Sequence, residues 1–275
     1  MRRPARRWRA RASLLHAQSL GCDGSHLPQS GADRPLVTPR LFLPGPLSAG
    51  GLHPLAPEQA HYLLRVLRLA AGDPVLCCDG AGELWQAVLV RSGSRAFAVE
   101  LIACQLRTPA PTLRLHLLQG LLKGAAMDTV LQKATELGAT DIWLITSARS
   151  NVSLGPDRVE RKREHWLGIL ESAAAQCQQL HLPALHGPMA LPDALAGMAG
   201  TPLLLLDPGA APLPHALPAG PVGILVGPEG GFAGPERDLA LGRGAIACGL
   251  GSLILRAETA PLAALAAVRH SRGWS

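Results

Sequence analysis

Short apolar runs and helix-spaced apolar residues alternate along the second part of the chain, residues 108–275. Runs of aliphatic residues bounded by glycine, proline or polar residues predict buried strands at 113–118, 141–146, 201–207, 222–226 and 245–249. Apolar residues at helical spacing predict helices at about 127–137, 156–179, 234–243 and from about 260 onward. Strands and helices in this order predict an α/β fold with a largely parallel sheet and helices on its faces.

Two of the predicted helices carry signals at their ends. Gly138 follows the first helix, where glycine commonly terminates a helix. Thr259 is expected to cap the last helix, and Pro261 is tolerated in its first turn.

Residues 38–107 show a strand-rich pattern instead. Apolar runs at 74–78, 84–90 and 96–102 predict three strands, and Asp-Gly-Ala-Gly at 79–82 is a hairpin signal between the first two. A helix is predicted at 57–69, with Leu63, Val66 and Leu67 on its buried face and Arg65 and Arg68 facing outward. A small antiparallel barrel with one helix fits this pattern.

Composition changes mark the segment boundaries. A proline-bearing linker at 106–112 separates a domain at 38–107 from a domain at 108–275. Residues 1–37 begin with six arginines by position 11 and then show no periodicity, which favours a basic, disordered extension. A targeting peptide and an RNA-contacting arm are the alternatives for this extension.

Charge and cysteine usage narrow the class of protein. The net charge is +6 and the isoelectric point is near 9.4, which suits an anionic partner. No apolar run approaches the ~20 residues of a membrane span, so a soluble protein without a membrane partner is expected. The six cysteines form no pair or cluster with ligand spacing, so we predict no metal site, no disulfide framework and a reducing cytoplasm.

Two glycine-bearing loops follow predicted strands near the end of the chain. The strand at 222–226 ends in Gly-Pro-Glu-Gly-Gly at 227–231, and the next strand ends in Gly-Leu-Gly at 249–251. Glycines at strand ends permit the close approach of a ligand, so a ligand cleft is expected there. The second loop begins like a dinucleotide fingerprint but lacks its third glycine and a later acidic residue, which argues against an NAD-dependent oxidoreductase.

The two loops together resemble the signature of one family. Gly-Pro-Glu-Gly-Gly at 227–231 and Leu-Gly-Ser-Leu-Ile-Leu-Arg-Ala-Glu-Thr-Ala at 250–260 are similar to the RsmE-type 16S rRNA uridine-N3 methyltransferases of the SPOUT class. Lys-Gly at 123–124, Gln-Lys-Ala-Thr-Glu-Leu-Gly at 132–138, Arg-Ser at 149–150 and Ala-Ala-Gln-Cys at 174–177 match further motifs. The resemblance covers about 38–270 and includes the helix at 57–69, which is similar to a PUA-like RNA-binding domain.

The resemblance implies a fold, a cofactor and a reaction. The expected fold is an N-terminal PUA-like β-barrel followed by a C-terminal SPOUT α/β domain with a trefoil knot. S-adenosylmethionine should lie in the knot, and the methyl acceptor should be N3 of a uridine in 16S (small-subunit) ribosomal RNA. The expected cofactor-binding residues are Gly227, Gly230, Gly231, Leu250, Gly251, Ser252, Ile254 and Leu255. A homodimer in the cytoplasm is expected.

Catalytic and RNA-binding roles follow from the same resemblance. Arg256 should stabilise charge on the uracil carbonyl oxygens, and Glu229 and Glu258 should remove the N3 proton or orient Arg256. The uridine must be unpaired or extruded to expose N3. RNA contacts are expected from Arg65, Arg68, Lys123, Lys133, Arg149 and Gln176.

The chain also departs from the family pattern. Ala125 and Ala126 replace charged residues, Gln179 replaces an arginine, and Pro261 is unusual. Two alternatives to the 16S reaction therefore stay open. One is a related SPOUT methyltransferase with another RNA target, such as a tRNA, and the other is a catalytically inactive RNA-binding protein.

Overall fold

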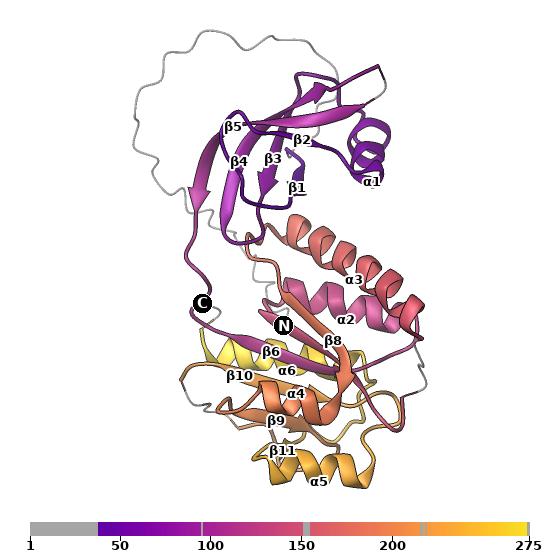
Figure 1. The fold of residues 1–275 in the computed structure, drawn as a ribbon. Helices are drawn as coiled ribbons and strands as arrows, with labels where there is room; N and C mark the ends of the chain where they lie inside the picture. Colours follow the sequence, from indigo (N-terminus) through magenta and orange to yellow (C-terminus); the bar gives the residue numbers. More distant parts are fainter. Residues whose placement is uncertain (1–37, 95, 151–154, 215–216, 218, 274–275) are drawn as a thin grey trace, which may run out of the picture. The chain divides into compact units, whose positions relative to one another are not determined.

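A computed structural model gives the fold of residues 38–94, 96–150, 155–214, 217 and 219–273 (Figure 1). The expected extension at residues 1–37 lies outside the described residues. Within the described residues, no helix has both the length and the apolar character that a membrane span requires.

The first part of the chain forms a curled five-stranded sheet in the order β1-β3-β4-β5-β2. Strand β1 runs parallel to β3, and the other neighbours are antiparallel. Leu63, Val75, Leu89, Val99 and Leu101 belong to its buried core. The elements are β1 Arg40–Phe42, β2 Leu52–Pro54, α1 Pro57–His61, the π-helix η1 Tyr62–Val66, β3 Pro74–Cys78, β4 Glu83–Arg91 and β5 Phe97–Arg107.

The helix predicted at 57–69 is partly wrong. Its α-helical part ends at His61, and a π-helical turn follows in which the Leu67 N–H donates to the Tyr62 carbonyl at 2.9 Å. A π-turn holds more residues than an α-turn, so side chains beyond it rotate away from the positions that a period of 3.6 assigns. Leu63 is buried as predicted, but Val66 is 58% exposed. Arg65 and Arg68 are both exposed, as predicted.

The second part forms a six-stranded parallel sheet in the order β11-β9-β10-β6-β7-β8, which confirms the predicted α/β pattern. Its strands are β6 Leu115–Gly120, β7 Asp141–Thr146, β8 Ala184–Ala190, β9 Leu203–Leu206, β10 Val222–Val226 and β11 Ile246–Cys248. Its helices are α2 Ala125–Glu136, α3 Pro156–Cys177, α4 Leu191–Gly197, α5 Gly234–Gly242 and α6 Thr259–Ser271.

Helices cover both faces of this sheet (Figure 1). Leu115 and Leu117 of β6 point to one face and pack in a core cluster with residues of α2, α3 and α6. Leu118 points to the other face and packs in a cluster with residues of α4 and α5. The strict alternation along β6 follows from the two-residue repeat of a strand.

Two elements of this domain were missing from the prediction. Strand β8 contains Gly187-Pro188 and little β-branched sequence, and α4 has only seven residues. A strand sequence interrupted by Gly-Pro and a helix of seven residues give neither a clear period of two nor one of 3.6.

One predicted helix end is confirmed and one is wrong. Gly138 has a φ of 80° directly after α2, and the Arg269 guanidinium donates to the Leu137 carbonyl at 3.1 Å. Thr259, however, is the first residue of α6. Glu258 takes the cap position without a side-chain cap hydrogen bond, because the Arg256 carbonyl already accepts the first two N–H groups, those of Thr259 and Ala260.

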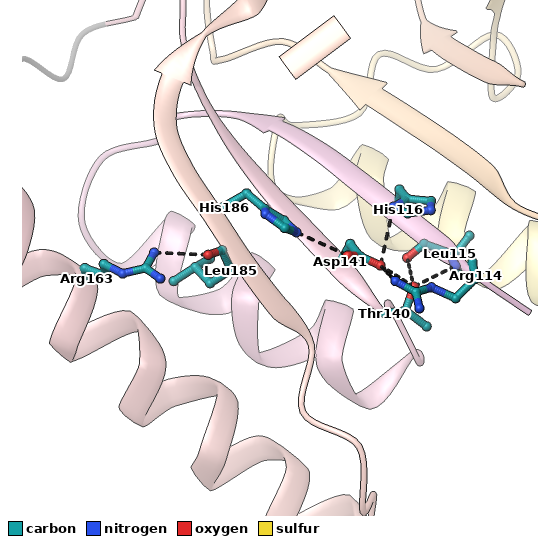
Figure 2. Close-up of polar contacts among 8 residues, drawn as sticks. All are labelled: Arg114, Leu115, His116, Thr140, Asp141, Arg163, Leu185 and His186. Carbon is teal, nitrogen blue, oxygen red and sulfur yellow. Dashed lines mark hydrogen bonds and ion pairs between the residues drawn. The ribbon is translucent and has the colours of Figure 1, made fainter. Parts of the chain in front are cut away.

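A buried carboxylate ties the amino ends of β6, β7 and β8 together (Figure 2). The Asp141 Oδ2 atom accepts from the Thr140 hydroxyl at 2.8 Å and from the Arg114 guanidinium at 2.9 Å, and it lies 3.4 Å from His116 Nδ1. The other oxygen lies 3.1 Å from His186 Nε2. His186 in turn stacks on Trp143 at 3.9 Å. Asp141 is therefore a stabilising junction of three neighbouring strands.

The surroundings of this junction lower the pKa values of both Asp141 and His116, which favours the charged form of the carboxylate and the neutral form of the imidazole. Burial alone would raise the pKa of Asp141. The hydrogen bonds from His186 and Thr140, with the charge of His116 and the hydrogen bond from Arg114, outweigh that and hold it below its usual value. Burial lowers the pKa of His116, and Arg114 and His186 act in the same direction against the attraction of Asp141. The folded state therefore favours a charged Asp141 and a neutral His116.

Replacing Asp141 with alanine should lower the free energy of unfolding by ~1–3 kcal/mol, because it removes the acceptor of several hydrogen bonds and leaves the nearly buried His116 and the partly buried His186 without it. Urea unfolding followed by circular dichroism measures this loss. The control is Asp238→Ala on the exposed side of α5, where a change within ~0.5 kcal/mol is expected. Equal losses in both variants would contradict the assigned role of Asp141.

Stability should fall as the pH drops below about 6.5, because the unfolded chain protonates His116 at its ordinary pKa and the folded chain, in which that pKa is lowered, resists protonation. The depressed pKa of Asp141 adds a further loss at more acidic pH. Urea midpoints should depend less on pH in His116→Asn than in the parent protein. His61→Asn, at an exposed position, should keep the parent pH dependence. An unchanged pH dependence in His116→Asn would rule out this assignment.

Candidate cofactor pocket and active site

A pocket of about 180 Å³ lies at the carboxyl ends of β9, β10 and β11. Neighbouring parallel strands end at the same edge of the sheet, so the loops that follow them meet there. Six of the eight predicted cofactor-binding residues line the pocket, namely Gly227, Gly231, Leu250, Gly251, Ile254 and Leu255. Gly230 and Ser252 do not line it.

Close backbone packing shapes the loop at 227–231. A Cβ atom at Gly120, the last residue of β6, would lie 2.5 Å from the nitrogen of Pro228. A Cβ atom at Gly227 would lie 3.0 Å from the backbone of Gly231. The loop therefore folds onto itself and onto the end of β6 at distances that only glycine allows.

Several lining residues were not predicted. Leu206, Asp207 and Pro208 follow or end β9, Cys248 ends β11, and Leu253 belongs to the last loop. The predicted strand at 201–207 ended in Asp207, so a polar residue at the carboxyl end of a parallel strand was the available signal.

The charged groups of the lining are acidic. Asp207 pairs with Arg237 of α5, with 2.7 Å between Oδ2 and Nε, and Glu229 carries the second carboxylate. Burial raises the pKa of the Cys248 thiol to about 11, so this thiol stays neutral near pH 7. The pocket therefore combines apolar walls with two carboxylates, a lining suited to a ligand with an apolar part and a positive charge.

Glu229, Lys123 and Arg149 are brought together around the loop at 227–231. The Glu229 Oε1 atom accepts the Lys123 backbone N–H at 3.2 Å. The Arg149 guanidinium donates to the Gly230 carbonyl at 3.2 Å. Lys123 and Arg149, both expected to contact RNA, thus lie beside the cofactor loop.

Arg256 and Glu258 lie at the start of α6. The Arg256 side chain is 86% exposed, and its Nη1 atom is 3.9 Å from Glu258 Oε1. Leu253 and Ile254 just before it are 80% and 85% exposed. This segment therefore presents a guanidinium and two apolar side chains to solvent beside the pocket.

The other expected RNA contacts do not line the pocket. Lys133 of α2 pairs with Glu136 at 2.7 Å, and Gln176 is exposed in the last turn of α3. Arg65 and Arg68 belong to the part of the chain that forms the curled five-stranded sheet. Among the described residues, no group of three or more His, Cys, Asp or Glu residues is placed to hold a metal ion.

Comparison with known families identifies the class of protein. Residues 108–269 match the family model described as an RNA methyltransferase domain, and residues 55–102 match the RNA methyltransferase PUA domain. The chain belongs to the RNA methyltransferase family. The resemblance seen in the sequence is therefore confirmed.

Several relatives carry the name ribosomal RNA small subunit methyltransferase E. The Synechocystis protein is 34% identical, covering 78% of this chain and 71% of its own length. The Bacillus subtilis protein is 28% identical, covering 78% of this chain and 88% of its own length.

Solved structures agree with these relatives. Ribosomal RNA small subunit methyltransferase E from Neisseria gonorrhoeae, solved with S-adenosylmethionine, has a TM-score of 0.77 and 32% identity over 84% of this chain and 97% of its own. The Legionella pneumophila protein Lpg2936, also solved with that cofactor, has a TM-score of 0.79 and 29% identity over 86% and 98%. The predicted PUA-like and SPOUT fold class of this RNA methyltransferase is confirmed.

Replacing Gly120 with alanine should displace the loop at 227–231, because the new Cβ atom meets backbone rather than a flexible side chain. Affinity for S-adenosylmethionine, the expected cofactor, should fall at least about tenfold, and overpacking should cost ~1–3 kcal/mol of stability. Titration calorimetry and thermal unfolding measure the two effects.

Gly168→Ala is the matched control for Gly120→Ala. A Cβ atom at this α3 position meets nothing within 4 Å, so cofactor affinity should not change. Its stability should rise by ~0.5–1 kcal/mol, since alanine favours a helix interior over glycine. Parent-like cofactor affinity in Gly120→Ala would contradict the assigned packing.

Proposed function

We propose that this RNA methyltransferase transfers a methyl group from S-adenosylmethionine to N3 of a uridine in 16S (small-subunit) ribosomal RNA. The main support is that the two motif loops, at 227–231 and 249–255, close around one pocket. Relatives named as small-subunit ribosomal RNA methyltransferases match most of the chain.

The pocket suits this cofactor. Leu250, Ile254 and Leu255 offer apolar contacts for an adenine ring, and the glycines at 227, 231 and 251 leave backbone groups accessible. The carboxylate of Glu229 favours the positive charge of the sulfonium and amino groups, whereas the charge of Asp207 is offset by its ion pair with Arg237. When bound, S-adenosylmethionine supplies an electrophilic methyl group.

The reaction forms a bond from N3 to the methyl carbon and breaks the bond from that carbon to sulfur, while the N3 proton leaves to a base. We assign the base role to Glu229 or Glu258, both close to the cofactor loops. Arg256 stabilises the negative charge that develops on the uracil carbonyl oxygens. The Arg256 Nη1 atom lies 3.9 Å from Glu258 Oε1, so the guanidinium and this carboxylate are neighbours.

The remaining assignments concern the RNA. An unpaired or extruded uridine presents N3 to the pocket, since base pairing covers that edge. Lys123 and Arg149 lie next to the cofactor loop and contact the phosphates nearest the uridine. Arg65 and Arg68, in a barrel domain at 38–107, hold RNA further away, and Lys133 and Gln176 of the domain at 108–275 contribute from α2 and α3.

Three further features complete the proposal. The cofactor loops form a trefoil knot, the protein acts as a homodimer, and it works in the cytoplasm. Exposed Leu253 and Ile254 support the dimer, because an apolar pair beside the pocket is stabilised when a partner covers it.

Two of the departures from the family pattern have local roles. Ala126 packs against the core below α2, and the Gln179 side chain donates to the His181 carbonyl at 2.7 Å. Neither substitution removes a group from the pocket lining.

The decisive experiment is incubation of the protein with labelled S-adenosylmethionine and small-subunit particles or 16S ribosomal RNA, followed by nucleoside mass spectrometry. The expected product is 3-methyluridine at one site, and because it blocks the pairing edge, reverse transcription stops there. Methylation of tRNA alone would replace the ribosomal substrate. Cofactor binding without product on any RNA would indicate an inactive RNA-binding protein, and binding of NAD instead would overturn the assignment.

Replacing Arg256 with alanine should lower kcat by about 10²- to 10³-fold, the scale for loss of one charge-stabilising donor. Cofactor affinity should stay within about twofold, since the exposed guanidinium is outside the pocket lining. Single-turnover methyl transfer and calorimetry measure the two quantities. Arg243→Ala, exposed at the end of α5, is the control and should behave like the parent. Normal turnover in Arg256→Ala would remove Arg256 from the catalytic assignment.

A further inference from the structure

Three loops meet beside the pocket at the carboxyl edge of the parallel sheet. They follow β6, β7 and β10 and occupy residues 121–124, 147–150 and 227–233. Only the last contributes to the pocket lining. The other two loops therefore affect a ligand of the pocket through their contacts with the loop at 227–233.

The Glu236 carboxylate, in the first turn of α5, connects two of these loops. Its Oε1 atom accepts the Ala148 backbone N–H at 2.9 Å. Its Oε2 atom accepts the Ser147 hydroxyl at 3.1 Å and the Ala233 backbone N–H at 2.8 Å. Both carboxylate oxygens are thus used, and two of the three donors are 88 and 89 residues away in the chain.

Further hydrogen bonds close the set of three loops. The Arg149 guanidinium donates to the Gly230 carbonyl at 3.2 Å, and the Ser150 hydroxyl donates to the Leu121 carbonyl at 3.3 Å. Glu229 accepts the Lys123 N–H at 3.2 Å. Each of the three loops is therefore hydrogen-bonded to both of the others.

A carboxylate three residues into a helix commonly satisfies the backbone N–H at the helix start, and the bond to Ala233 does so here. That role needs one oxygen and nothing beyond α5. The bonds to Ser147 and Ala148 serve another purpose, because they fix the residue that precedes Arg149 and, with it, the direction from which Arg149 reaches Gly230.

We infer that Glu236 is a positioning residue for the cofactor pocket. It holds the loop at 147–150 against the start of α5, and Arg149 then holds the loop at 227–231 in the shape that binds S-adenosylmethionine. Glu236 does not line the pocket and acts through Ser147, Ala148 and Arg149. The inference rests on the proposed function, since it takes S-adenosylmethionine as the ligand.

The test is calorimetric titration of Glu236→Gln with S-adenosylmethionine. Glutamine keeps the size of the side chain but turns one accepting oxygen into an NH₂ group that faces donors. The expected result is about tenfold weaker binding, because charge-assisted hydrogen bonds are lost. The KM for the cofactor should rise by a similar factor.

Asp238→Asn is the matched control, two residues further along α5 and exposed, and should bind like the parent. Parent-like affinity in Glu236→Gln overturns the inference, as does a lowered Tm with unchanged affinity. If the parent protein itself does not bind S-adenosylmethionine, the proposed function fails instead, so the two failures are distinguishable.

A second variant tests the route through Arg149. Arg149→Met removes the donor to Gly230, and it should weaken cofactor binding by itself. If Glu236 acts through Arg149, the two changes break the same connection. The double variant Glu236→Gln with Arg149→Met should then bind the cofactor only slightly more weakly than whichever single variant has the lower affinity. Fully additive losses would overturn the route through Arg149.

Discussion

The close approach of two backbone segments at the carboxyl edge of the parallel sheet is the constraint on which the pocket depends. Gly120 ends β6 against Pro228, and the side chain of buried Gln119 donates to the carbonyls of Gly120 and Gly227 at 2.9 and 3.4 Å. These contacts turn the loop after β10 back on itself. The loops after β9 and β11 then enclose the space it leaves.

The two edges of the parallel sheet, at the amino and the carboxyl ends of its strands, have different physical tasks. At their amino ends, Asp141 and its partners join β6, β7 and β8 through buried charge-assisted contacts that favour a single arrangement (Figure 2). At the carboxyl ends of β9, β10 and β11, glycines and exposed loops leave backbone groups available to a ligand. A rigid junction at one end lets the other end carry loops that fold mainly for binding.

Local sequence patterns predicted the elements with strong periodicity and failed where tertiary contacts decide. The strand at 222–226 and the loop after it could be predicted, because an aliphatic run indicates a buried strand and glycines indicate a loop without reference to distant residues. The π-turn at 62–66, strand β8 with its Gly-Pro interruption and the seven-residue α4 have no comparable signal. Asp207 lies far in sequence from its partner Arg237, and Glu236 lies far from its partner Ala148. Only the fold brings these pairs together at the site.

The pocket and the catalytic segment differ in how complete they are within one chain. The lining of the pocket comes from loops that pack against each other, whereas Arg256 is 86% exposed beside two exposed apolar side chains. A guanidinium in water is screened and stabilises a developing negative charge only weakly. Its contribution becomes large when water is excluded around it. Under the proposed function, the single chain supplies the cofactor pocket, and RNA or a second subunit is needed to cover the segment at 252–258 and exclude water around Arg256.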